Sequence, residues 1–159
     1  ICQGGQPIIR YNFGANKPAR VKKAFFTQFC TCVIYTTLFW LVVMIFPKAF
    51  ATIFTSDKEL VTYSAWALRI YMAGIFSLGF QVSCQQSFMA LGQAKVSLLL
   101  ACLRKIVLLI PLIFILPNFF DNKVFAVFLA EPVSDIIAAA VTTITFFTLF
   151  NSILKKEKR

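Results

Sequence analysis

The sequence has 159 residues, of which 59% are hydrophobic and 16% aromatic, and its mean hydropathy is +0.79. These values exceed those of water-soluble globular domains, so they exclude an ordinary soluble domain and favour an all-α integral membrane protein. The net charge of +10 does not indicate a nucleic-acid partner, because the basic residues stand at the ends of apolar segments, where membrane topology explains them.

Residues 1–9 look like the end of a transmembrane helix. The chain opens at Ile1 without the basic region, apolar run and cleavage site of a signal peptide, so we expect it to be a fragment. Asn, Gly and Pro residues then predict a loop over 11–18. Residues 24–46 include no charged residue, and a helix of this length reaches about 34 Å, which crosses a hydrocarbon core of about 30 Å. This is the first complete span.

The mixed segment over 48–69 alternates aromatic and apolar residues with polar ones. It predicts a short amphipathic connector at the membrane interface, with Ser56 or Asp57 capping the next helix. The second span then runs from about 70 to 91 and ends at Gly92, a common C-terminal stop.

The third span, 96–116, follows the second after a turn so short that the two helices must be antiparallel neighbours. Pro117 closes it. The last apolar stretch, 124–154, would be about 46 Å long if fully helical, so it must tilt, bend or protrude from the bilayer. The sequence therefore predicts four transmembrane helices plus the end of a fifth.

Basic residues give these spans an orientation. Ten of them fall on one side: Arg10, Lys17, Arg20, Lys22, Lys23, Lys95, Lys155, Lys156, Lys158 and Arg159. Four fall on the other: Lys48, Lys58, Arg69 and Lys123. Because basic residues are enriched in cytoplasmic loops, we expect the first side, and with it the C-terminus, to be cytoplasmic.

The five cysteines lie at or inside apolar segments: Cys2, Cys30, Cys32, Cys84 and Cys102. That placement is typical of buried small side chains and not of a disulfide framework. The sequence has no histidine to complete a zinc site and no nucleophile beside a base. We therefore expect no enzyme, no catalytic residue, no metal and no organic cofactor.

Polar residues inside the second span form a candidate substrate-binding stripe. Ser77, Gln81, Gln85 and Phe88 recur at four, four and three residues, which places them on one helix face. Amides can bind varied ligands and an aromatic face can hold a cation, so one interpretation is a cavity lining. The alternative is hydrogen bonding between helices that stabilises packing by about 0.6 to 2 kcal/mol.

Glu131 and Asp135 share one face of the last span and are the candidate ion-coupling residues. If that span is centred near residue 139, they lie about 12 and 6 Å from the bilayer midplane. A carboxylate at such a depth costs about 2.5 to 3.5 kcal/mol, so a proton or a partner is expected. Alternatively the helix slides outward, leaving Glu131 at the interface and Asp135 paired structurally with Arg104 or Lys105.

Several motifs in the chain are similar to those of one transporter family and occur in the same order: Gln-Pro-Ile-Ile-Arg-Tyr-Asn-Phe-Gly-Ala (6–15), Arg-Val-Lys-Lys-Ala-Phe (20–25), Phe-Thr-Ser-Asp (54–57), Phe-Met-Ala-Leu-Gly-Gln-Ala-Lys (88–95), Ile-Pro-Leu (110–112) and Ala-Glu-Pro-Val-Ser-Asp (130–135). Together they resemble the C-terminal lobe of the multidrug and toxic compound extrusion (MATE) transporters over essentially the whole chain. At position 10 the family motif leads us to expect a small residue, and this chain has Arg10 instead.

The resemblance implies twelve helices in two six-helix lobes. This chain would then hold the end of helix eight and four complete helices: 1–9 for helix eight, 24–46 for nine, 70–91 for ten, 96–116 for eleven and 124–154 for twelve. It also implies a multi-pass plasma-membrane antiporter that exports drugs or organic cations in exchange for protons or sodium ions. The expected partners are the lipid bilayer, small amphipathic or cationic substrates, and an N-terminal lobe of the same chain.

Other functions remain open at this point. One is a lipid-linked oligosaccharide flippase of the same superfamily. A flippase would be expected to have a more cationic central groove, whereas few cations lie at the centre of these spans. A membrane receptor or scaffold without transport is another. For the sodium-coupled branch of the family, the resemblance implies an acidic residue near 77–81. This sequence has none there, which argues against sodium coupling through this lobe.

Overall fold

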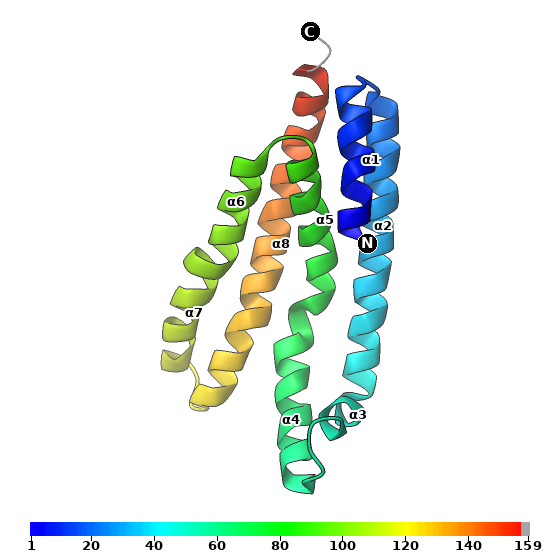
Figure 1. Cartoon of the computed structure of the whole chain (residues 1–159). Helices are drawn as coiled ribbons and strands as arrows, with labels where there is room; N and C mark the ends of the chain where they lie inside the picture. Colours follow the sequence, from blue (N-terminus) through cyan, green and yellow to red (C-terminus); the bar gives the residue numbers. More distant parts are fainter. Residues whose placement is uncertain (157–159) are drawn as a thin grey trace.

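The computed structural model describes residues 1–156, and within them every secondary-structure element is helical (Figure 1). The α-helices are α1 (Cys2–Gly14), α2 (Pro18–Ile45), α3 (Pro47–Thr52), α4 (Lys58–Tyr71), α5 (Ile75–Ala90), α6 (Ala94–Cys102), α7 (Ile110–Ile115) and α8 (Lys123–Lys156). Two 3-10 turns and one π-helical segment complete them: Met72–Gly74, Leu116–Asn118 and Leu103–Leu109.

Four continuous helical stretches are long and apolar enough to cross a membrane. They are Pro18–Ile45, Lys58–Ala90, Ala94–Asn118 and Lys123–Leu154. The first 3-10 turn joins α4 to α5, and the π-helical segment joins α6 to α7, so each of these pairs forms one stretch. The predicted all-α membrane fold with four spans and the end of another helix is confirmed.

Two connections differ from the expectation. The second span begins at Lys58 rather than near residue 70, because Asp57 caps it: Asp57 Oδ1 accepts hydrogen bonds from the backbone N–H groups of Glu59, at 2.9 Å, and Leu60, at 3.4 Å. The predicted cap is thus confirmed, whereas the expected connector is mostly helix. The expected loop over 11–18 is also shorter, since α1 continues to Gly14.

The turn between α1 and α2, the turn between α5 and α6, and the end of α8 all lie at one end of the molecule (Figure 1). The connections between α2 and α3 and between α7 and α8 lie toward the other end. The connections between successive spans thus alternate between the two ends of the molecule, as the distribution of basic residues predicted. Of the expected cytoplasmic tail, Lys158 and Arg159 lie outside the described residues.

An aromatic cluster joins three of the spans. Phe25 of α2, Phe88 of α5 and Phe146 of α8 are all fully buried. The ring centroid of Phe146 lies 4.5 Å from that of Phe25 and 4.9 Å from that of Phe88. Aromatic pairs at such distances add roughly 0.5 to 1.5 kcal/mol beyond area burial in soluble proteins, so this cluster holds α2, α5 and α8 together.

Glycines allow the same helices to approach each other closely. A Cβ atom built on Gly79 of α5 would lie 3.0 Å from Val33 Cα of α2 and would also meet the Thr36 side chain. A Cβ atom on Gly74 would lie 2.7 Å from Pro132 Cα of α8. Small residues at helix crossings are how membrane helices bring their backbones into contact.

We predict that Gly79→Ala destabilises the protein. The added methyl group would push against the Val33 backbone, which cannot rotate away as a side chain can, and such overpacking costs about 1 to 3 kcal/mol. The measurement is the melting temperature of the purified full-length protein in detergent. Gly4→Ala is the matched control, because no atom lies within 4 Å of its added Cβ, and equal melting temperatures for the two variants would contradict the prediction.

Candidate functional site

Four charged side chains from two adjacent elements form a connected group, the four-charge cluster: Arg104, Lys105, Glu131 and Asp135. Arg104 Nε donates to Asp135 Oδ1 at 2.6 Å, and Lys105 Nζ donates to Glu131 Oε1 at 2.9 Å. Arg104 Nη2 also lies 3.6 Å from Glu131 Oε1. Two cations therefore face two carboxylates, and the formal charges cancel.

Local helix geometry presents both pairs to each other. Glu131 and Asp135 are four residues apart on α8, so they lie on one face. Arg104 and Lys105 are adjacent in the chain, and both reach α8 from the π-helical segment Leu103–Leu109, whose turn is wider than that of an α-helix. Ser134 supports the arrangement, because its hydroxyl donates to the Arg104 carbonyl oxygen at 3.2 Å.

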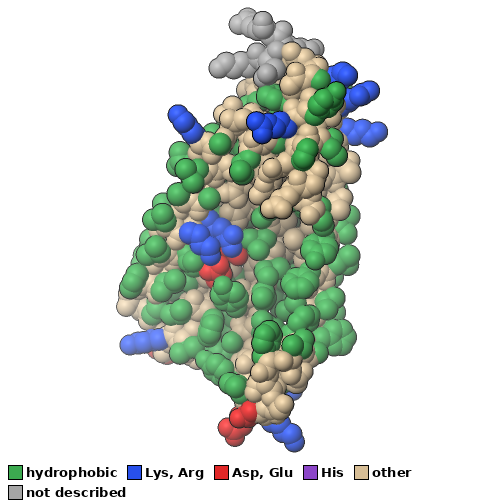
Figure 2. Space-filling model, in the orientation of Figure 1, with side chains coloured by type: hydrophobic (Ala, Val, Ile, Leu, Met, Phe, Trp, Pro, Cys, Tyr) green, Lys and Arg blue, Asp and Glu red, His purple; other side chains and the backbone are tan. Residues whose placement is uncertain are grey.

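The cluster lies midway along the molecule, surrounded by hydrophobic side chains (Figure 2). Asp135 is 3% exposed, whereas the side chain of Lys105 is 54% exposed. Charged side chains at this depth of a membrane protein almost always face the protein interior or a water-filled cavity, because contact with lipid is costly. We therefore expect the open side of the cluster to face protein or water.

Sequence reasoning anticipated the pairing but left two alternatives. Asp135 contacts Arg104, as the structural alternative required. Glu131 bonds to Lys105, and its side chain is 12% exposed. The ion-coupling role of both residues stays a prediction. Ser134 and the π-helical segment were missed, and the only signal for them was a pair of adjacent cations inside an apolar span.

The arrangement allows a carboxylate to change its charge without stranding its partner. If Asp135 takes up a proton, Arg104 loses its 2.6 Å ion pair but keeps Glu131 at 3.6 Å as a second anion. A small cation at the open side could likewise compete with Lys105 for Glu131. The cluster is thus chemically suited to exchange a proton or a cation within the span.

The predicted substrate stripe lies at helix contacts. Ser77, Gln81 and Phe88 are buried, and Phe88 belongs to the aromatic cluster. Ser77 Oγ donates to the Gly74 carbonyl oxygen of its own chain segment at 2.7 Å. Gln81 Oε1 is buried and has no hydrogen-bond partner within the described residues.

Gln85 binds the neighbouring helix. Its Nε2 atom donates to the Ser97 carbonyl oxygen of α6 at 3.0 Å, and Ser97 Oγ donates to the Gln85 carbonyl oxygen at 3.2 Å. These hydrogen bonds join two helices, as expected if the polar residues of the stripe stabilise helix packing. A part in substrate binding for the four residues stays a prediction.

Comparison with known proteins identifies relatives of this chain. The sequence model of the family described as MatE matches residues 1–115. The multidrug export protein MepA of Staphylococcus saprophyticus is 24% identical over 143 residues, which cover 89% of this chain and 31% of that protein.

Two solved structures have the same fold. An inward-facing multidrug resistance MATE family transporter of the MOP superfamily matches with a TM-score of 0.88 and 16% identity, over 97% of this chain and 36% of that one. The MATE multidrug transporter DinF-BH matches with a TM-score of 0.84 and 30% identity, over 92% of this chain and 32% of that one. The chain thus spans about a third of the length of these relatives.

We predict that Arg104→Met destabilises the protein and that adding Asp135→Leu restores much of the loss. Removing the cation leaves Asp135 as a buried charge without its closest partner, and breaking a buried pair costs about 3 to 5 kcal/mol. Replacing both partners of such a pair by apolar groups is often tolerated, so the double variant should recover stability. Melting temperatures in detergent measure both effects. Arg69→Met, at an exposed arginine of α4, is the control, and a double variant less stable than Arg104→Met would contradict the prediction.

Proposed function

Because the chain belongs to the MatE family, we propose that the protein is a secondary active antiporter that exports drugs or organic cations in exchange for protons or sodium ions. The observation that carries this proposal is the match of the family over residues 1–115. Similarity to proteins described as multidrug exporters and multidrug transporters supports the substrate class.

The described helices would form part of one lobe of such a transporter. Since the chain spans about a third of its relatives, a second lobe would come from the rest of the polypeptide, and the substrate would bind between the two. We assign the chain to the C-terminal lobe on the order of its motifs. The protein would be a multi-pass protein of the plasma membrane with a cytoplasmic C-terminus, and it would need no cofactor besides the coupling ion.

The four-charge cluster is the proposed coupling element within this chain. Asp135 would take up the ion, because it is buried in the span and because Arg104, which its carboxylate binds, has a second anion beside it. Uptake of a proton would weaken the link between α8 and the π-helical segment, and release would restore it. Transport requires such a difference in contacts between two states.

We predict that Asp135→Asn abolishes most gradient-driven efflux of a fluorescent organic cation from cells that express the full-length protein. An amide cannot take up a proton, so a coupling step at this residue would be lost. The measurement is dye accumulation after the proton gradient or the sodium gradient is collapsed in turn, which also identifies the ion.

Asp121→Asn is the matched control for this experiment, because Asp121 is an exposed residue between α7 and α8 and lies outside the spans. Surface expression and the melting temperature of each variant separate a coupling defect from a folding defect. Unchanged ion-driven efflux by Asp135→Asn would remove the coupling role of the cluster, and absence of ion-dependent efflux by the unmodified protein would refute the antiporter.

A further inference from the structure

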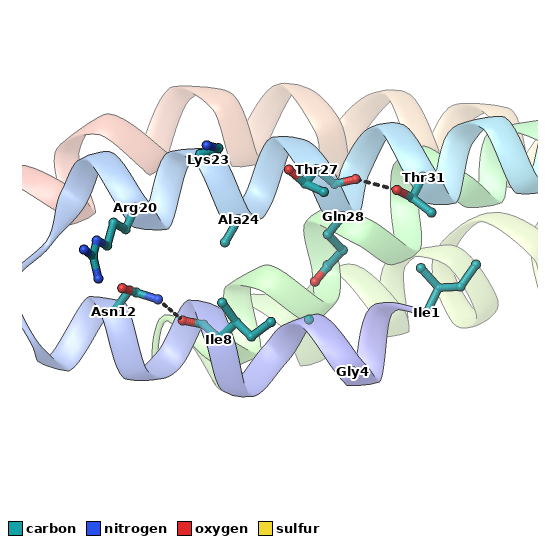
Figure 3. Close-up of a pocket in the computed structure, with 11 residues that line it drawn as sticks. Ile1, Gly4, Ile8, Asn12, Arg20, Lys23, Ala24, Thr27, Gln28 and Thr31 are labelled. Carbon is teal, nitrogen blue, oxygen red and sulfur yellow. Dashed lines mark hydrogen bonds between the residues drawn. The ribbon is translucent and has the colours of Figure 1, made fainter.

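A groove of about 550 Å³ runs between α1 and α2, on the side of the molecule where these two helices meet. Figure 3 shows Gly4 and Ile8 of α1 along one wall and Ala24 of α2 along the other. Arg20 stands toward the end of the groove near the turn between the helices, and Lys23 lies about one helix turn further along α2, at the level of Ala24. The four-charge cluster belongs to other elements, so the groove is a separate feature.

Small residues keep this groove open. Gly4 has no side chain, and no atom lies within 4 Å of a Cβ built on it, so this residue borders free space. Ala24 of α2, across from Ile8, contributes only a methyl group, and Ile8 supplies an apolar wall that is 55% exposed. Gln28, Thr27 and Thr31 line the rest of the α2 wall. The groove thus offers an apolar trough that the described helices leave unfilled.

The end of the groove near the turn is positively charged, because both Arg20 and Lys23 are exposed there. Residues 1–56 of the sequence include no aspartate or glutamate, so no acidic side chain of α1, α2 or α3 can neutralise these two cations. An anionic group is therefore the complementary occupant of the basic end.

The length of the groove matches one leaflet of a bilayer. Its lining on α2 extends from Arg20 to Thr31, which is about 17 Å along a helix at about 1.5 Å per residue. Half of a hydrocarbon core is about 15 Å. A molecule with its charged end at Arg20 and its chain beside Gly4 would therefore lie within a single leaflet.

We propose that this groove binds an anionic phospholipid of the leaflet that contains the turn between α1 and α2. The phosphate group would contact Arg20 and Lys23, and one acyl chain would lie in the trough between Gly4, Ile8 and Ala24. A soluble anion fits only the basic end, since it has no apolar part to fill the trough. The proposal requires that α2 spans the membrane, but it does not depend on transport.

Native mass spectrometry of the delipidated full-length protein in detergent tests the site. The probes are dioleoyl phosphatidylglycerol, which is anionic, and dioleoyl phosphatidylcholine, which has no net charge, added in equal amounts. We expect the unmodified protein to retain the anionic lipid preferentially. Equal retention of the two lipids would overturn the proposal, because it would show that the basic end selects nothing.

Two double variants test the basic end. Arg20→Gln with Lys23→Gln should weaken binding of the anionic lipid by about thirtyfold, because it removes two charges next to the phosphate. Lys17→Gln with Lys22→Gln is the matched control, since it removes the same charge from exposed residues at the same end that do not line the groove. An equal loss in both double variants would overturn the site in favour of a diffuse positive surface.

Gly4→Leu tests the apolar trough with all charges retained. The new side chain would enter the free space beside Gly4, so we expect it to displace the lipid without disturbing the helices, and an unchanged melting temperature checks the latter. Full retention of the anionic lipid by Gly4→Leu, together with its displacement by excess inorganic phosphate, would show a soluble-anion site and overturn the lipid assignment.

Discussion

The low polarity of the bilayer is the constraint on which the rest of the structure depends, and the contact between Arg104 and Asp135 shows its effect most directly. A lone charge at this depth is costly, so each carboxylate of the four-charge cluster has a cation from the π-helical segment beside it. Ser134 accompanies the pair by binding the Arg104 carbonyl oxygen. The four charged side chains of the cluster are thus paired with each other, and these pairs link α8 to the π-helical segment.

The same constraint shapes the apolar contacts. Burial of apolar surface gives little advantage where the solvent is itself apolar, so the helices depend on close packing. Gly79 brings α5 against the backbone of α2, and Gly74, just before α5, lies against Pro132. Toward the other end of α5, Phe88 packs edge-on against Phe146 of α8. The segment from Gly74 to Phe88 therefore combines close backbone approaches at its glycines with ring contacts at its phenylalanines.

Hydropathy and turn residues predicted the four spans and the cap at Asp57 because both follow from local sequence. They did not predict that helix continues from Lys58 into the second span, since a polar first turn and a polar connector have the same composition. Spacing placed Ser77, Gln81 and Phe88 on one face, but a helical period cannot distinguish a face that lines a cavity from one that packs on a neighbour. The groove beside Gly4 depends on how α1 and α2 are placed, which no local pattern encodes.

The two charged features of the chain have opposite relations to lipid. At the four-charge cluster, both signs lie midway along the molecule, so that side of α8 and the π-helical segment requires protein or water as its neighbour. At the groove, charge of one sign stands at the end of an apolar trough, which complements the charge and shape of an anionic lipid. The α1 and α2 side is therefore suited to face the bilayer, whereas the side that carries Lys105 and Glu131 is suited to face protein or water.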